Sequence, residues 1–355
     1  MKNIFTIIGG LIMVTLVTVG ANGCDFSGAG GIFRSADQGD NFVLSATIEG
    51  TDKAISSQNI LILTSRPTDS TNILAGAIEG LYQSINGGET WAEVPNFTGE
   101  RVAGIKYNPA DDQNLFLTIS NRIVRTTDGG TTWRAVYSDP SIIGTLEMNP
   151  KNAAELYIGN MDGIVIKSRN SGESWSTIGS FNTPVMKVVV SPTNPNYVYA
   201  VTASEVYVSK NGGDTWEEIT PVKDTTTIAP EITNNFNEYM IQPLISGAVD
   251  YFNQDVFYLL TSFGLFGTAN SGTNWAYIEE IPLDPEAPQI LNVISSPLRK
   301  NTLMLVSQNR FYQSVDRGAT WSVYGIPTEK PLKAILENDQ FIIVGTSAED
   351  IYPEE

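Results

Sequence analysis

One short pattern recurs seven times along the chain and constrains its fold more than any other feature. It consists of Ser or Thr, any residue, Asp or Asn, any residue, Gly, any two residues and an aromatic residue. The copies contain all six tryptophans, and the first copy carries Phe in place of Trp. These eight-residue segments, named turn motifs below, span residues 35–42, 84–91, 126–133, 168–175, 209–216, 268–275 and 314–321.

Each turn motif is expected to form the turn of a β-hairpin, because short runs with alternating apolar residues precede and follow it. In such a turn an Asp or Asn side chain accepts hydrogen bonds from loop amides, Gly tolerates positive φ, and the aromatic ring packs beneath. The repetition indicates a structural role. The third residues are Asp37, Asn86, Asp128, Asn170, Asn211, Asn270 and Asp316, and the last are Phe42, Trp91, Trp133, Trp175, Trp216, Trp275 and Trp321.

The spacing of the motifs predicts a propeller. Their aromatic residues lie 41 to 59 residues apart, which is the length of a four-stranded propeller blade. A helical solenoid would need long periodicity of 3.6 residues, whereas these apolar residues alternate between turn formers. We therefore predict an all-β fold, a single seven-bladed β-propeller of four-stranded antiparallel blades over residues 31–355. One blade is predicted to have strands over residues 104–107, 115–119, 122–126 and 133–137, with a turn over 108–112.

The two ends of the repeat region are expected to close the ring. Residues 31–34 begin with only the third and fourth strands of a blade, and residues 332–336 and 341–344 supply the first and second. Pairing of these segments would hide two open sheet edges. Residues 349–352 also resemble the start of a strand, and we interpret them as a tail.

The amino terminus is predicted to be an export signal, residues 1–23. Lys2 supplies the positive charge, and residues 4–19 form an apolar run of 16 residues. A bilayer-spanning helix needs about 20 residues, so this run favours a signal peptide. Ala21 and Gly23 then precede Cys24, the only cysteine in the chain.

Residues 21–24 resemble the lipobox of bacterial lipoproteins. The match departs from the usual pattern at Ala21, where a larger aliphatic residue is typical, and at Asn22. The resemblance implies that Cys24 is lipidated and begins the mature protein, that residues 24–30 form a short linker, and that the protein is held at the cell envelope. Several acyl chains would hold it stably, since each buried methylene contributes about 0.8 kcal/mol. The alternative is an ordinary signal or an uncleaved anchor, and both also predict export.

Composition narrows the possible partners. A formal net charge of −18 disfavours binding to nucleic acid or to anionic lipid headgroups. The absence of His removes Ser-His-Asp triads and most zinc sites. No Asp-x-Asp-x-Asp spacing points to a cation, and the glycine-rich motifs lack the helix and lysine of a phosphate cradle. We expect no metal, no cofactor and no nucleic-acid partner, and any enzyme chemistry must use carboxylates.

The turn motif resembles the Asp-box, or bacterial neuraminidase repeat. This repeat occurs in sialidases, sortilin-type receptors, xyloglucanase-type glycosidases and the photosystem II assembly-factor family, and it lies away from their active sites. The resemblance therefore implies fold rather than function. A sialidase would need an arginine triad, a Tyr and Glu pair and an Arg-Ile-Pro motif, and the nearest match, residues 65–67, lacks the Ile. Xyloglucanase-type enzymes place two acidic residues between two propellers, whereas this sequence encodes one.

The sequence is most similar to the photosystem II stability and assembly factor-like group, with seven blades, Asp-boxes and a signal followed by cysteine. That resemblance implies a scaffold without catalytic residues. The arginine patch of the photosynthetic members is not evident here, so their partner is not carried over. We predict an exported, membrane-tethered and non-catalytic module that binds an envelope protein or a glycan. The alternative is an extracellular glycoside hydrolase or lyase that uses paired carboxylates.

The expected ligand face is the one opposite the turn motifs. It carries the loops from second to third strands and the connections from each fourth strand to the next blade. The longest connections, 220–244 and 281–289, are of the second kind. The short loops carry Glu79, Asn121, Asp162, Glu205, Phe263 and Asn309, which we expect to form a polar, mildly acidic pocket near the axis. The alternative is that these residues are solvated and bind no ligand.

Overall fold

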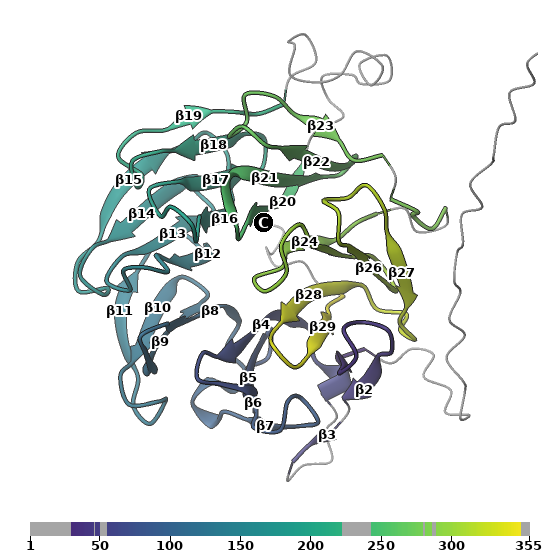
Figure 1. Ribbon diagram of the computed structural model, residues 1–355. Helices are drawn as coiled ribbons and strands as arrows, with labels where there is room; N and C mark the ends of the chain where they lie inside the picture. Colours follow the sequence, from purple (N-terminus) through teal and green to yellow (C-terminus); the bar gives the residue numbers. More distant parts are fainter. Residues whose placement is uncertain are drawn as a thin grey trace, which may run out of the picture.

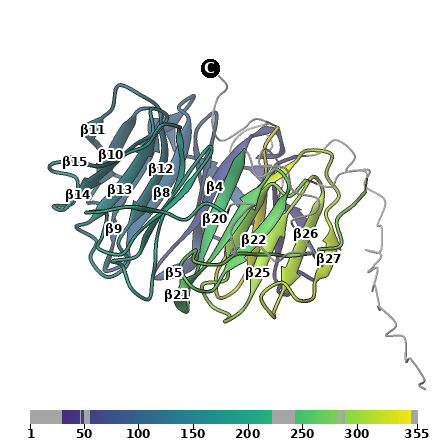
Figure 2. The same ribbon diagram turned by 90° about the horizontal axis from the view of Figure 1, so that it is seen from above.

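The computed structural model describes residues 30–45, 47–49, 55–221, 243–279, 281–285 and 289–348. These residues form 29 strands in seven sheets that surround a central axis (Figure 1). In the perpendicular view the strands run between the two faces of the ring (Figure 2). The described residues contain only two helical segments, the 3-10 turns Ile55–Ser57 and Pro95–Phe97. The predicted all-β, seven-bladed propeller is confirmed.

Every blade is an antiparallel meander whose first strand is nearest the axis. Blade 2 consists of β4 (Ile60–Arg66), β5 (Asp69–Ala77), β6 (Leu81–Ser84) and β7 (Thr90–Glu93). Blade 3 consists of β8 (Val102–Asn108), β9 (Asp111–Ile119), β10 (Arg122–Thr126) and β11 (Arg134–Ser138). Blade 4 consists of β12 (Ile143–Met148), β13 (Leu156–Asn160), β14 (Ile164–Ser168) and β15 (Ser176–Ser180). Blade 5 consists of β16 (Val185–Val190), β17 (Val198–Thr202), β18 (Val206–Ser209) and β19 (Glu217–Glu218). Blade 6 consists of β20 (Leu244–Asp250), β21 (Asn253–Thr261), β22 (Gly264–Thr268) and β23 (Ala276–Tyr277). Blade 7 consists of β24 (Asn292–Ser295), β25 (Leu303–Val306), β26 (Arg310–Ser314) and β27 (Ser322–Gly325).

Blade 1 is assembled from both ends of the repeat region. Its strands are β28 (Leu332–Glu337), β29 (Ile342–Thr346), β1 (Ile32–Ser35) and β2 (Val43–Ser45), in order from the axis outward. Strand β1 pairs antiparallel with β29, with Ile32 opposite Gly345. Each first strand also contacts the first strands of both neighbouring blades. The predicted closure is confirmed, and residues 349–352 lie outside the described residues.

Blade 2 carries a fifth strand that the sequence pattern did not predict. Strand β3 (Thr47–Ile48) pairs in parallel with β7, and the Glu49 amide donates to the Trp91 carbonyl at 2.7 Å. The Trp91 indole donates to the Ser45 hydroxyl at 2.8 Å. The connection from blade 1 is therefore fixed along the outer edge of blade 2.

The third blade differs slightly from its predicted boundaries. The turn expected over 108–112 contains only Pro109 and Ala110, because Asn108 pairs with Asp111 and its side chain accepts from the Ala110 amide at 2.9 Å. The fourth strand starts at Arg134 rather than at Trp133. Trp133 belongs to the turn, since its indole donates to the Gly130 carbonyl at 3.0 Å.

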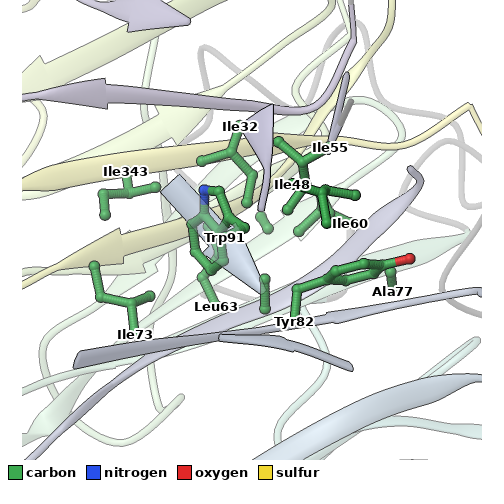
Figure 3. Packing of buried hydrophobic residues seen from close by; sticks show 12 residues of the cluster. Ile32, Ile48, Ile55, Ile60, Leu63, Ile73, Ala77, Tyr82, Trp91 and Ile343 are labelled. Atoms are coloured by element: carbon green, nitrogen blue, oxygen red, sulfur yellow. The ribbon is translucent and has the colours of Figure 1, made fainter. Parts of the chain in front are cut away.

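The hydrophobic core lies between neighbouring blades. The cluster between blades 1 and 2 includes Ile32, Ile60, Ile73 and Ile343 around Trp91, which is fully buried (Figure 3). Full burial of one such large apolar side chain contributes about 1.5–3 kcal/mol. Because the apolar area is shared by adjacent blades, the stability of each blade depends on its neighbours.

Candidate functional site

The seven turn motifs share one hydrogen-bond pattern between the third and fourth strands of each blade. The amide of the fifth residue, Gly, donates to the hydroxyl of the first residue at 2.7–2.9 Å. The amide of the seventh residue donates to the Asp or Asn side chain at 2.8–3.0 Å. The side chains of the first and third residues thus satisfy amides that the tight turn leaves without strand partners.

The backbone of the motif explains its glycine. The fourth and fifth residues both have positive φ in every copy, for example Ser171 at 56° and Gly172 at 85°. Side chains with a Cβ rarely adopt this region, so Gly is favoured at the fifth position. Four copies nevertheless place a residue other than Gly at the fourth position, where φ is 54–65°.

The motif carboxylates are held in the ionised form. Hydrogen bonds from the hydroxyl and amide of Thr132, and from Thr126, hold the pKa of Asp128 at about 2. Burial would raise the pKa of Asp37, but hydrogen bonds from Asn41 and Ser35 outweigh it and lower that pKa. A carboxylate held in this state does not serve as a general acid at neutral pH.

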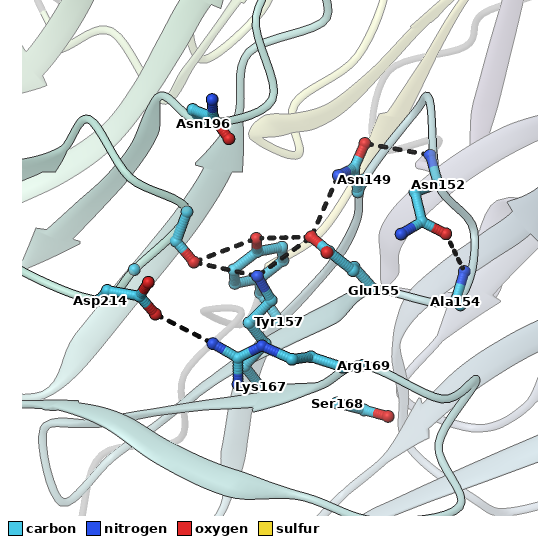
Figure 4. A network of polar contacts seen from close by, with 12 residues as sticks. Asn149, Asn152, Ala154, Glu155, Tyr157, Lys167, Ser168, Arg169, Asn196 and Asp214 are labelled. Carbon is cyan, nitrogen blue, oxygen red and sulfur yellow. Dashed lines mark hydrogen bonds and ion pairs between the residues drawn. The ribbon is translucent and has the colours of Figure 1, made fainter.

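The residue before a turn motif contacts the motif of the next blade at two places in the ring. The Lys167 ammonium, whose side chain is 5% exposed, donates to the Gly212 carbonyl at 3.1 Å and pairs with Glu155 at 3.0 Å (Figure 4). It also lies 4.8 Å from the Tyr157 ring centroid. Arg125 donates to the Ser171 carbonyl at 3.1 Å. In both cases the acceptor is the fourth motif residue, so we name these contacts inter-blade straps.

The six residues expected to form a ligand pocket lie in the turns between second and third strands, each in a different blade. Their polar contacts remain local: Glu205 accepts from Thr202 and Thr183, and Asn121 donates to the Asp139 carbonyl. Within the described residues, no hydrogen bond or ion pair joins two of the five polar members of this group. Residues 222–242 and 286–288, in the two long connections, lie outside the described residues.

A pocket of about 500 Å³ lies on the opposite face, which carries the turn motifs and the turns from first to second strands and is named the motif face. Its walls come from the β4–β5 turn, the β28–β29 turn and Leu298. Glu337 in its lining is 8% exposed and accepts from the Ser296 hydroxyl and from Arg299 Nε at 2.8 Å. The length of the connecting loops had predicted a pocket on the opposite face. The residues that line this pocket come from three blades, and no spacing pattern in the sequence relates them.

Exposed apolar side chains gather on the motif face as well. Among the described residues, the large apolar side chains with the greatest exposure include Tyr251 and Phe252 in the β20–β21 turn, each 42% exposed, and Leu298 at 51%. Ile85 and Val315 occupy the second position of turn motifs, and Val43 follows another. An antiparallel meander brings first-to-second and third-to-fourth turns to one end, so all these residues share this face. The motif face therefore offers several apolar side chains to a partner.

Polar side chains of several blades meet at the axis. Lys106 of β8 pairs with Glu147 of β12 at 2.8 Å. Lys187 of β16 donates to the Ser246 hydroxyl of β20 at 3.1 Å, and Ser246 donates to Asn292 of β24 at 3.3 Å. Sequence reasoning missed this group, although aligning the blades on their first strands would have placed three of its members together.

Tyr251 lies close to the same charges. Although Tyr251 is 42% exposed, desolvation of its phenol group raises the pKa, Lys106 lowers that pKa, and Glu147 and Glu337 raise it. Four blades therefore contribute to the electrostatic environment at the motif-face end of the axis.

Within the described residues, no helix is long and apolar enough to cross a membrane, and no cluster of Asp, Glu, Cys or His is arranged to hold a metal ion.

Seven antiparallel blades that share a hydrogen-bonded turn motif, closed by strands from both ends, define a seven-bladed β-propeller. The chain belongs to the DUF6242 beta propeller domain family, whose model matches residues 146–352. This match covers more than half of the chain and includes the axial residues Lys187, Ser246 and Asn292.

Similar proteins include enzymes and a peptide-binding protein. A xyloglucanase from a Paenibacillus species is 24% identical over 347 residues, which is 76% of this chain and 33% of the relative. The GH74 xyloglucanase of Xanthomonas campestris is 16% identical with a TM-score of 0.60, covering 79% of this chain and 46% of that one. YCF48 bound to D1 peptide is 16% identical with a TM-score of 0.58, covering 81% and 93%. The chain thus spans about a third of the xyloglucanase, and these structural likenesses show the fold alone.

Proposed function

We propose that the protein is an exported, membrane-tethered β-propeller that serves as a non-catalytic binding or assembly module for an envelope protein or a glycan. The observation that carries this proposal is the motif face, where a pocket of about 500 Å³ adjoins exposed Leu298. Exposed Tyr251 and Phe252 lie on the same face. Apolar anchors beside polar groups are typical of protein and ligand interfaces.

The state of two pocket carboxylates, Glu337 and Asp69, favours binding over catalysis. Glu337 is engaged by Arg299 and Ser296. Hydrogen bonds from the hydroxyl and amide of Thr71 lower the pKa of Asp69. A glycoside hydrolase needs one carboxylic acid with a raised pKa beside a second carboxylate, and the shift at Asp69 has the opposite direction.

The relatives favour each candidate function to a different degree. The structure of YCF48 bound to D1 peptide supports protein binding by a propeller of this shape, and almost all of that chain is covered. The xyloglucanase relative keeps a carbohydrate-active enzyme as the second candidate, since sequence similarity extends over 76% of this chain. Neither relative identifies the ligand of this chain.

The amino-terminal part of the proposal rests on sequence, because residues 1–29 lie outside the described residues. We propose that Cys24 carries the lipid anchor and that the Asp-box identity of the turn motifs explains their repetition. Expression in a bacterial host with an alkyne-tagged fatty acid tests the first point. The wild-type chain should be labelled and sediment with membranes, whereas Cys24→Ala should be unlabelled and released. Equal labelling of both proteins would refute lipidation at Cys24.

A binding experiment distinguishes the two faces and the two functions. The mature chain, residues 25–355, is incubated with solubilised envelope proteins and with a glycan array, and bound glycans are checked for cleavage. The proposal predicts saturable binding without products, weakened in the Phe252→Ser and Leu298→Ser variants. The matched controls Glu79→Ala and Asn309→Ala alter the opposite face and should bind like wild type. Glycan cleavage would favour the enzyme, and loss only in the controls would place the ligand on the originally predicted face.

A further inference from the structure

Lys187 stands out among the axial residues because it has no acidic partner in the part of the chain that the structure describes. Its ammonium donates to the Ser246 hydroxyl at 3.1 Å, and no described carboxylate lies within ion-pair distance of it. An ammonium group has three donors, and this is the only hydrogen bond that Lys187 Nζ makes to the described residues. By contrast, the Lys106 ammonium is 2.8 Å from Glu147.

The groups around Lys187 are arranged in one layer of the ring. Lys187, Ser246 and Asn292 pair with Val201, Leu260 and Val306 at equivalent positions of the second strands. Ser246 donates to Asn292, whose amide donates to the Lys333 carbonyl at 2.7 Å. Neutral side chains on two neighbouring blades therefore orient one another, and no described carboxylate pairs with the positive charge of Lys187.

Lys106 and Glu147 lie two residues further along their strands than the positions equivalent to Lys187, and the electrostatic environment of Lys187 disfavours its charge. Burial lowers the pKa of Lys187 to about 8, Lys106 lowers it further, and Glu147 opposes them. Glu147 already pairs with Lys106. Lys106, Glu147 and Lys187 together therefore carry a net charge of about +1 when both lysines are protonated. A lysine kept beside another cation at such an expense marks a candidate functional group.

We infer that the propeller axis binds a small oxyanion, a carboxylate or phosphate group, at Lys187, with Lys106 as the second cation and with Ser246 orienting the Lys187 ammonium. An oxyanion would accept the free N–H groups of Lys187 and neutralise the excess positive charge. Lysine acts here as a point charge without the planar selectivity of arginine, so both oxyanions fit this chemistry. The site lies at the axis and does not depend on the partner proposed for the motif face.

Titration calorimetry of the purified mature chain with sodium acetate and, separately, with sodium phosphate tests this inference at pH 7 and constant ionic strength. We expect saturable binding of at least one of them, weakened about tenfold or more in Lys187→Met, because a hydrogen bond to a charged group is lost. The matched control Lys210→Met removes an exposed lysine of the same blade and should bind like wild type. Binding of acetate alone would indicate a carboxylate ligand, and binding of phosphate alone a phosphate group.

Thermal unfolding gives a readout that a purely structural lysine would not produce. Without added oxyanion, Lys187→Met should melt at a higher temperature than wild type, and it should gain less when oxyanion is added. Equal responses of wild type and Lys187→Met, no binding of either oxyanion, or equal binding of chloride would overturn the inference.

A labelling experiment on the wild-type chain keeps the test independent of the variant's folding. Lysines are acetylated briefly at a series of pH values, and the modification of Lys187 is quantified by mass spectrometry. Bound oxyanion should protect Lys187 and move its labelling midpoint to higher pH, while Lys210 is unaffected. Identical labelling of Lys187 with and without oxyanion would also refute the site.

Discussion

Replacing Lys167 with Met tests how much an inter-blade strap stabilises the ring. Methionine keeps the apolar stem but removes the ammonium that pairs with Glu155 at 3.0 Å and donates to the Gly212 carbonyl at 3.1 Å. Removing one partner of a buried ion pair costs about 3–5 kcal/mol. The Glu155 side chain is 23% exposed and keeps hydrogen bonds from Asn149 and Tyr157, so we expect the lower limit, about 3 kcal/mol.

This free energy converts into a measurable shift in melting temperature. An unfolding entropy of about 2.1 cal/mol/K per residue gives about 0.7 kcal/mol/K for a ring of about 320 residues. Lys167→Met should therefore melt about 4–5 °C below wild type in scanning calorimetry.

The matched control is Lys210→Met, whose side chain is 48% exposed and pairs with the more exposed Glu217. A surface pair contributes about 0–1 kcal/mol, so its melting temperature should change by about 1.5 °C or less. Adding Glu155→Gln to Lys167→Met should recover part of the loss, because it removes the unpaired carboxylate. If Lys167→Met melts with the control, the strap does not stabilise the ring and the reasoning fails.

Three further predictions follow from the closure, the motifs and the axis. Deleting residues 332–355 removes β28 and β29, and should abolish the cooperative melting of the full chain; an unchanged calorimetric transition would contradict the closure. Asp128→Asn should melt like wild type at pH 7, since four motifs carry Asn there, whereas Asp128→Ala should melt lower. The folded pKa of Asp128, about 2, lies below that of an unfolded Asp, so the contribution of this carboxylate to stability is present above about pH 4 and is lost as pH falls through 2. In urea titrations at acid pH, wild type should therefore lose more stability than Asp128→Asn. For Lys187 the folded pKa of about 8 lies below the unfolded value of about 10.4. Wild type should therefore gain stability relative to Lys187→Met as pH rises from 8 to 10. Urea midpoints of the two proteins that change equally with pH would contradict this prediction.

The fold could be predicted from the sequence because each blade carries its own local signal. A turn motif fixes the position of the third-to-fourth turn, and the half-blades at the two ends leave one closed arrangement. Strand β3 escaped prediction because it has only two residues and pairs in parallel, so it shows no alternation. The straps escaped because Lys167 and its acceptor Gly212 are 45 residues apart and belong to different repeats.

The candidate site was less accessible to sequence reasoning. Loop length directed attention to Glu79 and its equivalents, whereas exposed Phe252 and Leu298 lie in short turns on the motif face. Lys106, Glu147 and Lys187 come from three blades, and their proximity depends on the curvature of the ring rather than on any spacing along the chain. Superimposing the repeats before reading individual residues would have brought Lys187, Ser246 and Asn292 into one column.

The pairing of Ile32 with Gly345 also sets the order in which the protein is able to fold. Contacts this distant in sequence form slowly, because a very long loop must close before they contribute. During synthesis the first strand is made early and the two strands that cover it come last. A nascent or interrupted chain therefore exposes an unpaired β-edge until its carboxyl-terminal strands arrive, which makes it a target for chaperones and for proteases that remove incomplete copies.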